Sequence, residues 1–284
     1  MIDLAATVAQ RPVVLDGGLG TLLEARGNDV TSALWSARVL RDDPDEVRAA
    51  HAEFVAAGAE VVITASYQLN VGGSIPDAEV ETLLRRSVSL AREAGDVVVA
   101  ASVGPIGALR ADGSEYTGDY GLSVAELRAL HRRRLLILAD AGADVLAIET
   151  IPSPLEVEAL ALELAELGLP AFVSVSADST GFAAVESRAE ALRTAASVPN
   201  VLAVGVNCCA PATVTAALAE APDVPLVAYP NTGERWDAAT RTWHGSAAPL
   251  ADEVPSWVAA GARLVGGCCR STPADIAAIA AAVR

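Results

Sequence analysis

Residues 141–149 read AGADVLAIE, an Ala-Gly-Ala junction followed at once by a short apolar run. Closely similar stretches occur as AGAEVVI at residues 57–63 and as AGARLVG at residues 260–266. Glycine often follows a helix end because it adopts positive φ without a Cβ penalty, and short apolar runs are typical of strands buried on both faces. The repetition predicts that one helix-to-strand turn is used again and again along the chain.

Eight apolar runs are expected to be parallel strands, separated by helical segments rich in Ala, Leu, Glu and Arg. The expected strands are Val13–Asp16, Val61–Ser66, Val97–Val103, Val145–Glu149, Ala171–Ser176, Leu202–Asn207, Leu226–Tyr229 and Arg263–Gly267. The clearest expected helices are Pro44–Ala57, Ala78–Ala94, Val124–Ala141, Pro154–Leu167, Arg188–Ala196 and Pro273–Val283. This pattern predicts an α/β fold in which residues 1–284 form a single (β/α)₈ TIM barrel. A doubly wound open sheet is the alternative.

Composition excludes several classes of partner. The formal net charge is −16 and no basic patch is apparent, so neither nucleic acid nor an anionic membrane is expected to bind. No apolar run approaches the about 20 residues that span a bilayer. The N-terminal stretch MIDLAATVAQRP resembles no export signal, which predicts a cytoplasmic protein.

The chain contains no lysine, since all 20 of its basic residues are arginine. Schiff-base catalysis and a P-loop lysine are therefore impossible.

The longest interruption of the βα pattern is Pro105–Leu122, which is rich in glycine and follows the third expected strand. A loop of this length at the active-site end of a barrel is often a substrate lid, and a plain surface excursion is the alternative.

The four cysteines form two adjacent pairs, Cys208-Cys209 and Cys268-Cys269, which follow the sixth and eighth expected strands. Those strands are two places apart, or roughly 10 Å at about 4.8 Å per strand, so thiolates from both could share one metal ion. Adjacent residues of a regular strand point to opposite faces, so Cys268 and Cys269 can share an ion only if the chain turns there. Spacing alone does not decide between Cys208 and Cys209. A redox dithiol is the rival interpretation, although the usual CxxC spacing is absent.

Two carboxylates, Asp16 and Glu149, also stand at expected strand ends. Carboxylates that face a shared cavity commonly bind an amine or act as acid and base, although helix capping or pairing with arginine is an alternative. The glycine-rich stretch after Asp16 leaves backbone N–H groups free to approach a substrate carboxylate. Of the three histidines, two fall in expected helices, and only His244 is a candidate for substrate contact.

Seven motifs together resemble the zinc-dependent homocysteine S-methyltransferase family, over nearly the whole chain. They are LDGGLGT (Leu15–Thr21), TASYQ (Thr64–Gln68), DGSEYTGDY (Asp112–Tyr120), IETIP (Ile148–Pro152), GVNCCAP (Gly205–Pro211), YPNTG (Tyr229–Gly233) and GGCC (Gly266–Cys269). GVNC followed by GGCC is the most specific part of the resemblance.

The resemblance implies a homocysteine-binding barrel with catalytic Zn²⁺ at the C-terminal face of the strands. Its implied ligands are Cys208, Cys268 and Cys269. It also implies that Asp16, Gly17 and Glu149 hold the amino-acid end of homocysteine, and that Tyr67 and Asn207 line the same pocket. No function is implied for Cys209.

Zinc with three thiolates carries formal charge −1, and the homocysteine thiolate in the open fourth position would make it −2. This excess charge keeps the bound sulfur nucleophilic and attracts a sulfonium, whose methyl group is then transferred to give methionine. S-methylmethionine is the first expected donor and S-adenosylmethionine the second. The expected partners are thus small molecules alone.

Three other functions remain open from the sequence. The same zinc chemistry would serve selenohomocysteine or selenocysteine as acceptor. A non-catalytic zinc or thiol redox sensor would need no carboxylates at the strand ends. A zinc hydrolase would normally use histidine and carboxylate ligands in place of three thiolates.

Overall fold

The structure, a computed structural model, describes residues 2–30, 36–73, 75–110, 114–177, 182, 185–237 and 242–284. Eight parallel strands form one sheet in the order β1-β10-β7-β6-β5-β4-β3-β2. A parallel bridge between Leu15 and Val61 joins its two outer strands, so the sheet closes into the predicted barrel. The strands are β1 (Val13–Val14), β2 (Val61–Ile63), β3 (Val98–Val103), β4 (Val145–Ile151), β5 (Ala171–Ser176), β6 (Val201–Asn207), β7 (Leu226–Tyr229) and β10 (Ala262–Val265).

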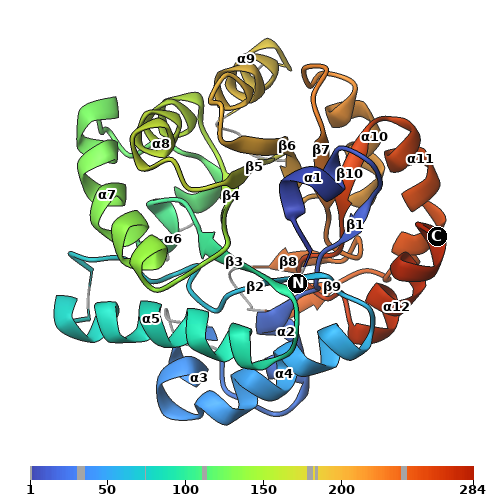
Figure 1. The fold of residues 1–284 in the computed structure, drawn as a ribbon, viewed down its shortest axis with the longest axis horizontal. Coiled ribbons are helices and arrows are strands. Elements are labelled where there is room, and N and C mark those ends of the chain that lie inside the picture. Colours follow the sequence, from blue (N-terminus) through green and yellow to red (C-terminus); the bar gives the residue numbers. More distant parts are fainter. Residues whose placement is uncertain are drawn as a thin grey trace.

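Helices surround the strands as an outer ring (Figure 1). All six of the expected helices are confirmed to within three residues at each end. In the described part of the chain, no helix is both long and apolar enough to cross a membrane. The helices that follow the N-terminal segment are α2 (Leu19–Ala25), α3 (Ser36–Asp42), α4 (Pro44–Ala56), α5 (Asp77–Glu93), α6 (Gly107–Arg110), α7 (Val124–Asp140), α8 (Pro154–Leu167), α9 (Val185–Ala196), α10 (Pro211–Leu218), α11 (Val254–Ala259) and α12 (Pro273–Ala282), with short 3₁₀ turns η1 (Ser114–Tyr116) and η2 (Leu250–Asp252).

Apolar side chains alternate between two faces along each strand. Ala100 of β3 and Ala147 of β4 belong to a cluster inside the barrel, whereas Leu146 belongs to the larger cluster between the strands and the helices. Since successive side chains of a strand point to opposite faces, the next inward positions are Ser102 and Glu149. The barrel interior therefore changes from apolar to polar toward the carboxyl ends of the strands.

The N-terminal helix α1 (Leu4–Val8) covers the other end of the barrel. Its buried Leu4 and Val8 join the inner cluster, together with residues at which the strands begin, such as Val98 and Val145. In Figure 1 this helix lies across the barrel interior. Because apolar side chains cover this end, the polar side chains of the barrel interior lie at the opposite end, where the strands finish.

Two connections at that polar end are elaborated. After β7 the chain forms an antiparallel hairpin of β8 (Arg235–Asp237) and β9 (Thr242–His244), which the sequence analysis did not predict. His244 lies at the end of this hairpin and is exposed. The expected lid after β3 contains α6 and η1, while residues 111–113, which include the first two residues of the DGSEYTGDY motif, lie outside the described residues.

Helix α4 contains a buried histidine that makes stability depend on pH. Neither ring nitrogen of His51 has a hydrogen-bond partner among the described residues, and burial lowers its pKa to about 4. The unfolded chain takes up a proton at about pH 6.5 that the folded protein does not accept until about pH 4, so the free energy of unfolding falls by roughly 3 kcal/mol across that window. His51→Leu should be more stable and should lose this part of the pH dependence. Urea unfolding at pH 7.5 and pH 5 checks this, and equal pH slopes in both proteins would contradict it.

Candidate metal and substrate site

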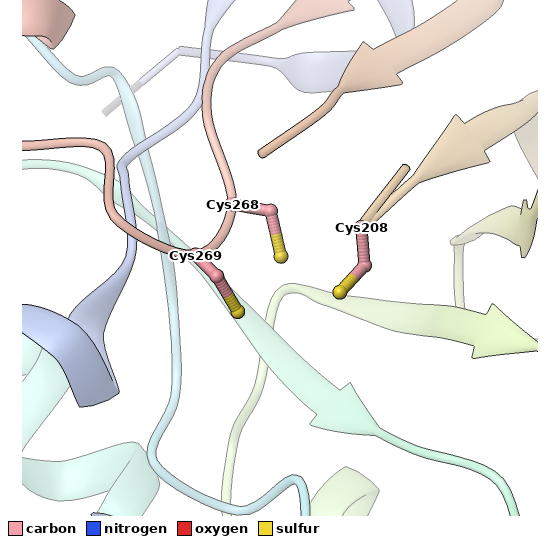
Figure 2. Close-up of side chains that lie close together, drawn as sticks. All are labelled: Cys208, Cys268 and Cys269. Atoms are coloured by element: carbon pink, nitrogen blue, oxygen red, sulfur yellow. The ribbon is translucent and has the colours of Figure 1, made fainter. Parts of the chain in front are cut away.

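Three cysteines meet where the strands finish. The Sγ atoms of Cys208, Cys268 and Cys269 all lie within 4.8 Å of one another. Figure 2 shows Cys208 just beyond the end of one strand, with Cys268 and Cys269 on a loop opposite and their sulfurs directed toward a common space. A soft, closely spaced sulfur donor set of this kind suits Zn²⁺, and three protein ligands leave one position for a substrate. The residues present therefore fit the expected zinc ion.

The cysteines reach the same point because they lie beyond the regular strands. The barrel strand β10 ends at Val265, so the alternation of a strand does not apply to Cys268 and Cys269. Cys208 follows the end of β6 and has a left-handed φ of 49°. A Cβ atom on Gly18 would lie 2.5 Å from the carbonyl oxygen of Cys268, so a glycine is needed where the β1 loop passes the cysteine loop.

Cys209 is not one of the three converging cysteines, because its side chain packs elsewhere. It is 1% exposed and belongs to the apolar cluster between the strands and the helices. The side chain of Cys208, by contrast, is among the three that converge. Of the two neighbours Cys208 and Cys209, between which spacing alone could not decide, Cys208 is the one that lies with Cys268 and Cys269.

The loop after β7 holds both cysteine segments in place. The amide of Cys208 donates to the carbonyl of Tyr229, the last residue of β7, at 3.2 Å. The amide of Cys268 donates to the carbonyl of Pro230 at 2.7 Å, and the amide of Cys269 donates to Asn231 Oδ1 at 3.1 Å. The Asn231 side chain also forms a hydrogen bond with the Cys208 thiol. One asparagine therefore connects the two cysteine segments, a role that the YPNTG motif had not suggested.

Asn231→Ala should weaken metal binding, because both cysteine segments lose their shared anchor. Loss of a partner that orients a metal ligand typically costs about 10- to 100-fold in affinity. Competition with a chromophoric chelator measures this directly. Zinc affinity equal to that of the unmodified protein would show that backbone contacts alone position the cysteines.

The thiols perturb one another strongly. Hydrogen bonds from Cys268 and Cys269 hold the pKa of the Cys208 thiol well below its usual range. The same contact with Cys208 raises the pKa of Cys268 and of Cys269 well above theirs. All three thiols can ionise together in this space only if a neighbouring cation neutralises them, and a bound metal ion supplies such a charge.

Two buried carboxylates lie beside the cysteines. Burial raises the pKa of Asp16 well above its usual range, and the nearby charge of Glu149 raises it further. Burial likewise raises the pKa of Glu149 to about 7, while the Cys208 charge adds to the effect. The backbone N–H of Ile63 donates to Asp16 Oδ2 at 2.9 Å, whereas Asp16 Oδ1 is buried with no partner in the described residues. Within the part of the chain that the structure describes, neither carboxylate has a basic partner, and such a pair suits a cationic ligand such as an ammonium group.

Inward-facing hydroxyls fix the orientation of Glu149. Ser102 on β3 donates to Glu149 Oε1, and the Tyr229 hydroxyl donates to Oε2 at 3.1 Å. The Tyr229 hydroxyl is also 2.7 Å from Ser174 Oγ. Sequence analysis missed Ser102 and gave Tyr229 no role, although strand alternation places both inside the barrel.

Asn207 is held within the same strand-end network. Its Oδ1 accepts hydrogen bonds from the Thr150 amide at 2.7 Å and from Ser174 Oγ at 2.9 Å, while its Nδ2 donates to Thr150 Oγ1 at 2.8 Å. Thr150 has φ of 60°, so Asn207 supports a left-handed turn directly after Glu149. Its observed partners are therefore protein groups that shape the pocket.

The remaining expected site residues lie on the loops after β1 and β2. Gly17 lies between the β1 strand end and α4, where an added Cβ atom would be 2.6 Å from the Phe54 ring. Tyr67 is half-buried and its ring packs against Gly104, at the start of the loop after β3. Both loops border the polar end of the barrel interior.

Comparison with known proteins gives consistent similarities over the whole fold. The sequence model of the family described as "Homocysteine S-methyltransferase" matches residues 13–283. The chain is 45% identical to homocysteine S-methyltransferase of Escherichia coli (strain K12), over 95% of this chain and 94% of that protein. It is 39% identical to selenocysteine methyltransferase of Astragalus bisulcatus, over 95% and 92%.

Solved structures show the same likeness. The metallated form of the homocysteine methyltransferase MmuM from Escherichia coli superimposes with a TM-score of 0.83 at 42% identity, covering 96% of each chain. Its oxidized form gives a TM-score of 0.85 at 41% identity, covering 99% of each chain.

Proposed function

Because the chain belongs to the homocysteine S-methyltransferase family and is thus a methyltransferase, we propose that it transfers a methyl group from a sulfonium donor to homocysteine, giving methionine. The observation that carries this proposal is the convergence of Cys208, Cys268 and Cys269 beside two buried carboxylates. The whole chain, residues 1–284, would act as one homocysteine-binding barrel domain.

The three cysteines would hold Zn²⁺. When bound there, zinc would supply the positive charge that keeps a substrate thiol deprotonated at neutral pH. Asp16 and Glu149 would bind the ammonium group of homocysteine, since both are buried and neither pairs with a basic side chain among the residues described. The backbone at Gly17 and the ring of Tyr67 would border the same substrate, while Asn207 would act through Thr150 on the turn beside it.

Methyl transfer then needs only alignment of the two substrates. A new bond forms between the homocysteine sulfur and the methyl carbon as the bond from that carbon to the donor sulfur breaks. The electron pair of the broken bond stays on the donor sulfur, which changes from a sulfonium to a neutral thioether. Zinc on three thiolates would carry formal charge −1, and the homocysteine thiolate would make it −2, which favours a cationic donor. S-methylmethionine is the proposed donor, with S-adenosylmethionine as the second candidate.

The test is to incubate zinc-loaded protein with ¹³C-labelled homocysteine and unlabelled S-methylmethionine, and to quantify ¹³C-methionine by mass spectrometry. S-adenosylmethionine replaces the donor in a parallel reaction. Labelled methionine formed faster from S-methylmethionine supports the proposal. If labelled methionine forms only with S-adenosylmethionine, that compound replaces S-methylmethionine as the assigned donor. If no labelled methionine forms with either sulfonium, the proposed reaction is overturned.

Selenium acceptors are the second candidate. The similarity to selenocysteine methyltransferase of Astragalus bisulcatus favours this possibility, because a selenolate can take the place of a thiolate in the same reaction. Competition between homocysteine and selenocysteine for a limiting amount of donor decides between them. A higher kcat/KM for selenocysteine would make the selenium compound the principal acceptor.

A further inference from the structure

A buried chain of polar side chains lies between α7 and α8, apart from the cysteines and carboxylates described above. Arg134 and His131 on α7 and Glu156 on α8 are all 0% exposed. The Arg134 guanidinium lies 2.7 Å from His131 Nδ1, and His131 Nε2 lies 2.9 Å from Glu156 Oε1. The three side chains therefore form a continuous hydrogen-bonded series inside the protein.

The bonding pattern defines the protonation of this series. Arginine can only donate, so His131 Nδ1 accepts and its Nε2 carries the proton that is donated to Glu156. Burial lowers the pKa of His131, in keeping with a neutral ring, and lowers the pKa of Arg134 to about 10, which leaves it charged at neutral pH. A neutral imidazole thus connects one buried cation with one buried carboxylate.

Glu156 holds both ends of the loop after β3. Its Oε1 accepts the backbone N–H of Ile106 at 2.7 Å, and its Oε2 accepts the Tyr120 hydroxyl at 3.0 Å. The Tyr120 hydroxyl in turn accepts a hydrogen bond from the Gly107 backbone. The base of this loop, defined here as residues 104–107 with Tyr120, is therefore closed on a single carboxylate.

Arg134 connects this loop base to the loop after β2. Its guanidinium donates to the carbonyl oxygen of Gly104 at 2.6 Å and to that of Leu69 at 3.4 Å. Gly104 in turn packs against the Tyr67 ring so closely that an added Cβ atom would lie 2.7 Å from two ring carbons. The position of Tyr67 thus depends on the two carbonyls that Arg134 holds.

We infer that Arg134, His131 and Glu156 form a positioning unit that sets Tyr67 and the loop base against the substrate pocket before substrate binds. This inference rests on the proposed function only for the role of Tyr67 as a wall of the homocysteine pocket. Arg134 contacts no reacting atom and acts through Gly104 and Leu69.

Simple packing of α7 on α8 does not require this arrangement. Burying a guanidinium and a carboxylate carries a large desolvation cost, and well-packed apolar residues often stabilise such a position as well or better. Apolar side chains, however, cannot hold the backbone groups of Ile106, Gly104 and Leu69. What the charged groups add is the fixed position of the two loops.

Arg134→Lys is the principal test, because it keeps the buried positive charge but lacks the planar fork that reaches two carbonyls and the imidazole together. Homocysteine KM is expected to rise about three- to tenfold, since a hydrogen bond to a charged group is lost and part of its free energy is transmitted to the pocket. We expect kcat to stay within about twofold and zinc content to stay unchanged, because this substitution leaves the cysteine loops untouched. Backbone hydrogen exchange should become faster in residues 64–70 and at the loop base.

Tyr120→Phe is a milder variant that keeps the ring and removes only the hydroxyl. Faster hydrogen exchange is expected at the loop base, with residues 64–70 unaffected. Ser87→Ala serves as the matched control, because Ser87 is also fully buried and its hydroxyl donates to Leu84 within α5 at 2.7 Å. The free energy of unfolding of the control should fall by about as much as that of Tyr120→Phe. Its backbone hydrogen exchange in either loop and its KM for homocysteine should stay unchanged.

The inference is overturned if both variants lose stability like the Ser87→Ala control while loop exchange and homocysteine KM match the unmodified protein. If Arg134→Lys does not fold, the exchange pattern of Tyr120→Phe against the control decides alone. Exchange is measured without turnover, so a failed methyl-transfer assay would overturn the proposed function and leave this result standing.

Discussion

Cys208→Ser is expected to give a folded protein that no longer retains zinc and no longer makes methionine. Serine has nearly the same size, but its hydroxyl stays protonated and is a poor zinc ligand. Loss of an orienting partner alone costs about 10- to 100-fold in metal affinity, so loss of a ligand should cost at least ~100-fold. Methionine formation should fall to the detection limit, because the remaining Cys268 and Cys269 cannot complete the three-sulfur cluster.

Cys209→Ser is the control that makes this result specific. The two cysteines are neighbours in sequence, but Cys209 is 1% exposed and packs in the apolar cluster. Its replacement should lower the free energy of unfolding by about 1–3 kcal/mol, because a hydroxyl is placed in apolar surroundings, and should leave zinc affinity unchanged. Zinc content retained by Cys208→Ser, or lost by Cys209→Ser alone, would contradict the assignment of the cluster.

Glu149→Gln is expected to lower kcat/KM for homocysteine by roughly 10- to 100-fold, through loss of one charge-assisted hydrogen bond to the substrate ammonium. Glutamine has nearly the same shape, so the hydroxyls of Ser102 and Tyr229 can still meet the side chain. Most of the effect should fall on KM for homocysteine, with a much smaller effect on KM for the donor. Steady-state kinetics with each substrate varied in turn measures the two contributions.

Glu163→Gln provides the matched comparison. Glu163 on α8 is as buried as Glu149, at 5% against 7% exposed, but it pairs with arginines of α7 on the outside of the barrel. Its replacement should destabilise the protein and leave both KM values within about twofold, since the substrate site is untouched. Equal effects of the two substitutions on homocysteine KM would show that Glu149 has no direct role in amine binding.

The sequence predicted those features that depend on local patterns. The repeated Ala-Gly-Ala junction identified the serial βα units, and each expected strand overlaps one strand of the barrel sheet. The convergence of Cys208 with Cys268 followed from the rule that parallel strands finish at one end of a barrel. Hydrophobic periodicity and chain topology were enough for both conclusions.

Contacts that depend on register and on loop conformation were not predictable in the same way. Ser102 reaches Glu149 only because β3 and β4 pair with Ser102 opposite Ala147, two residues before Glu149. Asn231 joins the two cysteine segments through a loop whose path no periodicity encodes. His131 is one of the two histidines in expected helices, and its place between Arg134 and Glu156 emerges only from the packing of α7 on α8.

The central claim is that a metal ion on the three cysteines converts homocysteine into its thiolate on binding. Isothermal titration of zinc-loaded protein at pH 7, repeated in buffers of different ionisation enthalpy, counts the protons released on binding. A free thiol with a pKa near about 8.5 is mostly protonated at this pH, so homocysteine should release about one proton more than methionine, which has no thiol. Equal proton release by homocysteine and methionine would contradict the claim, because the substrate sulfur would then bind as a thiol.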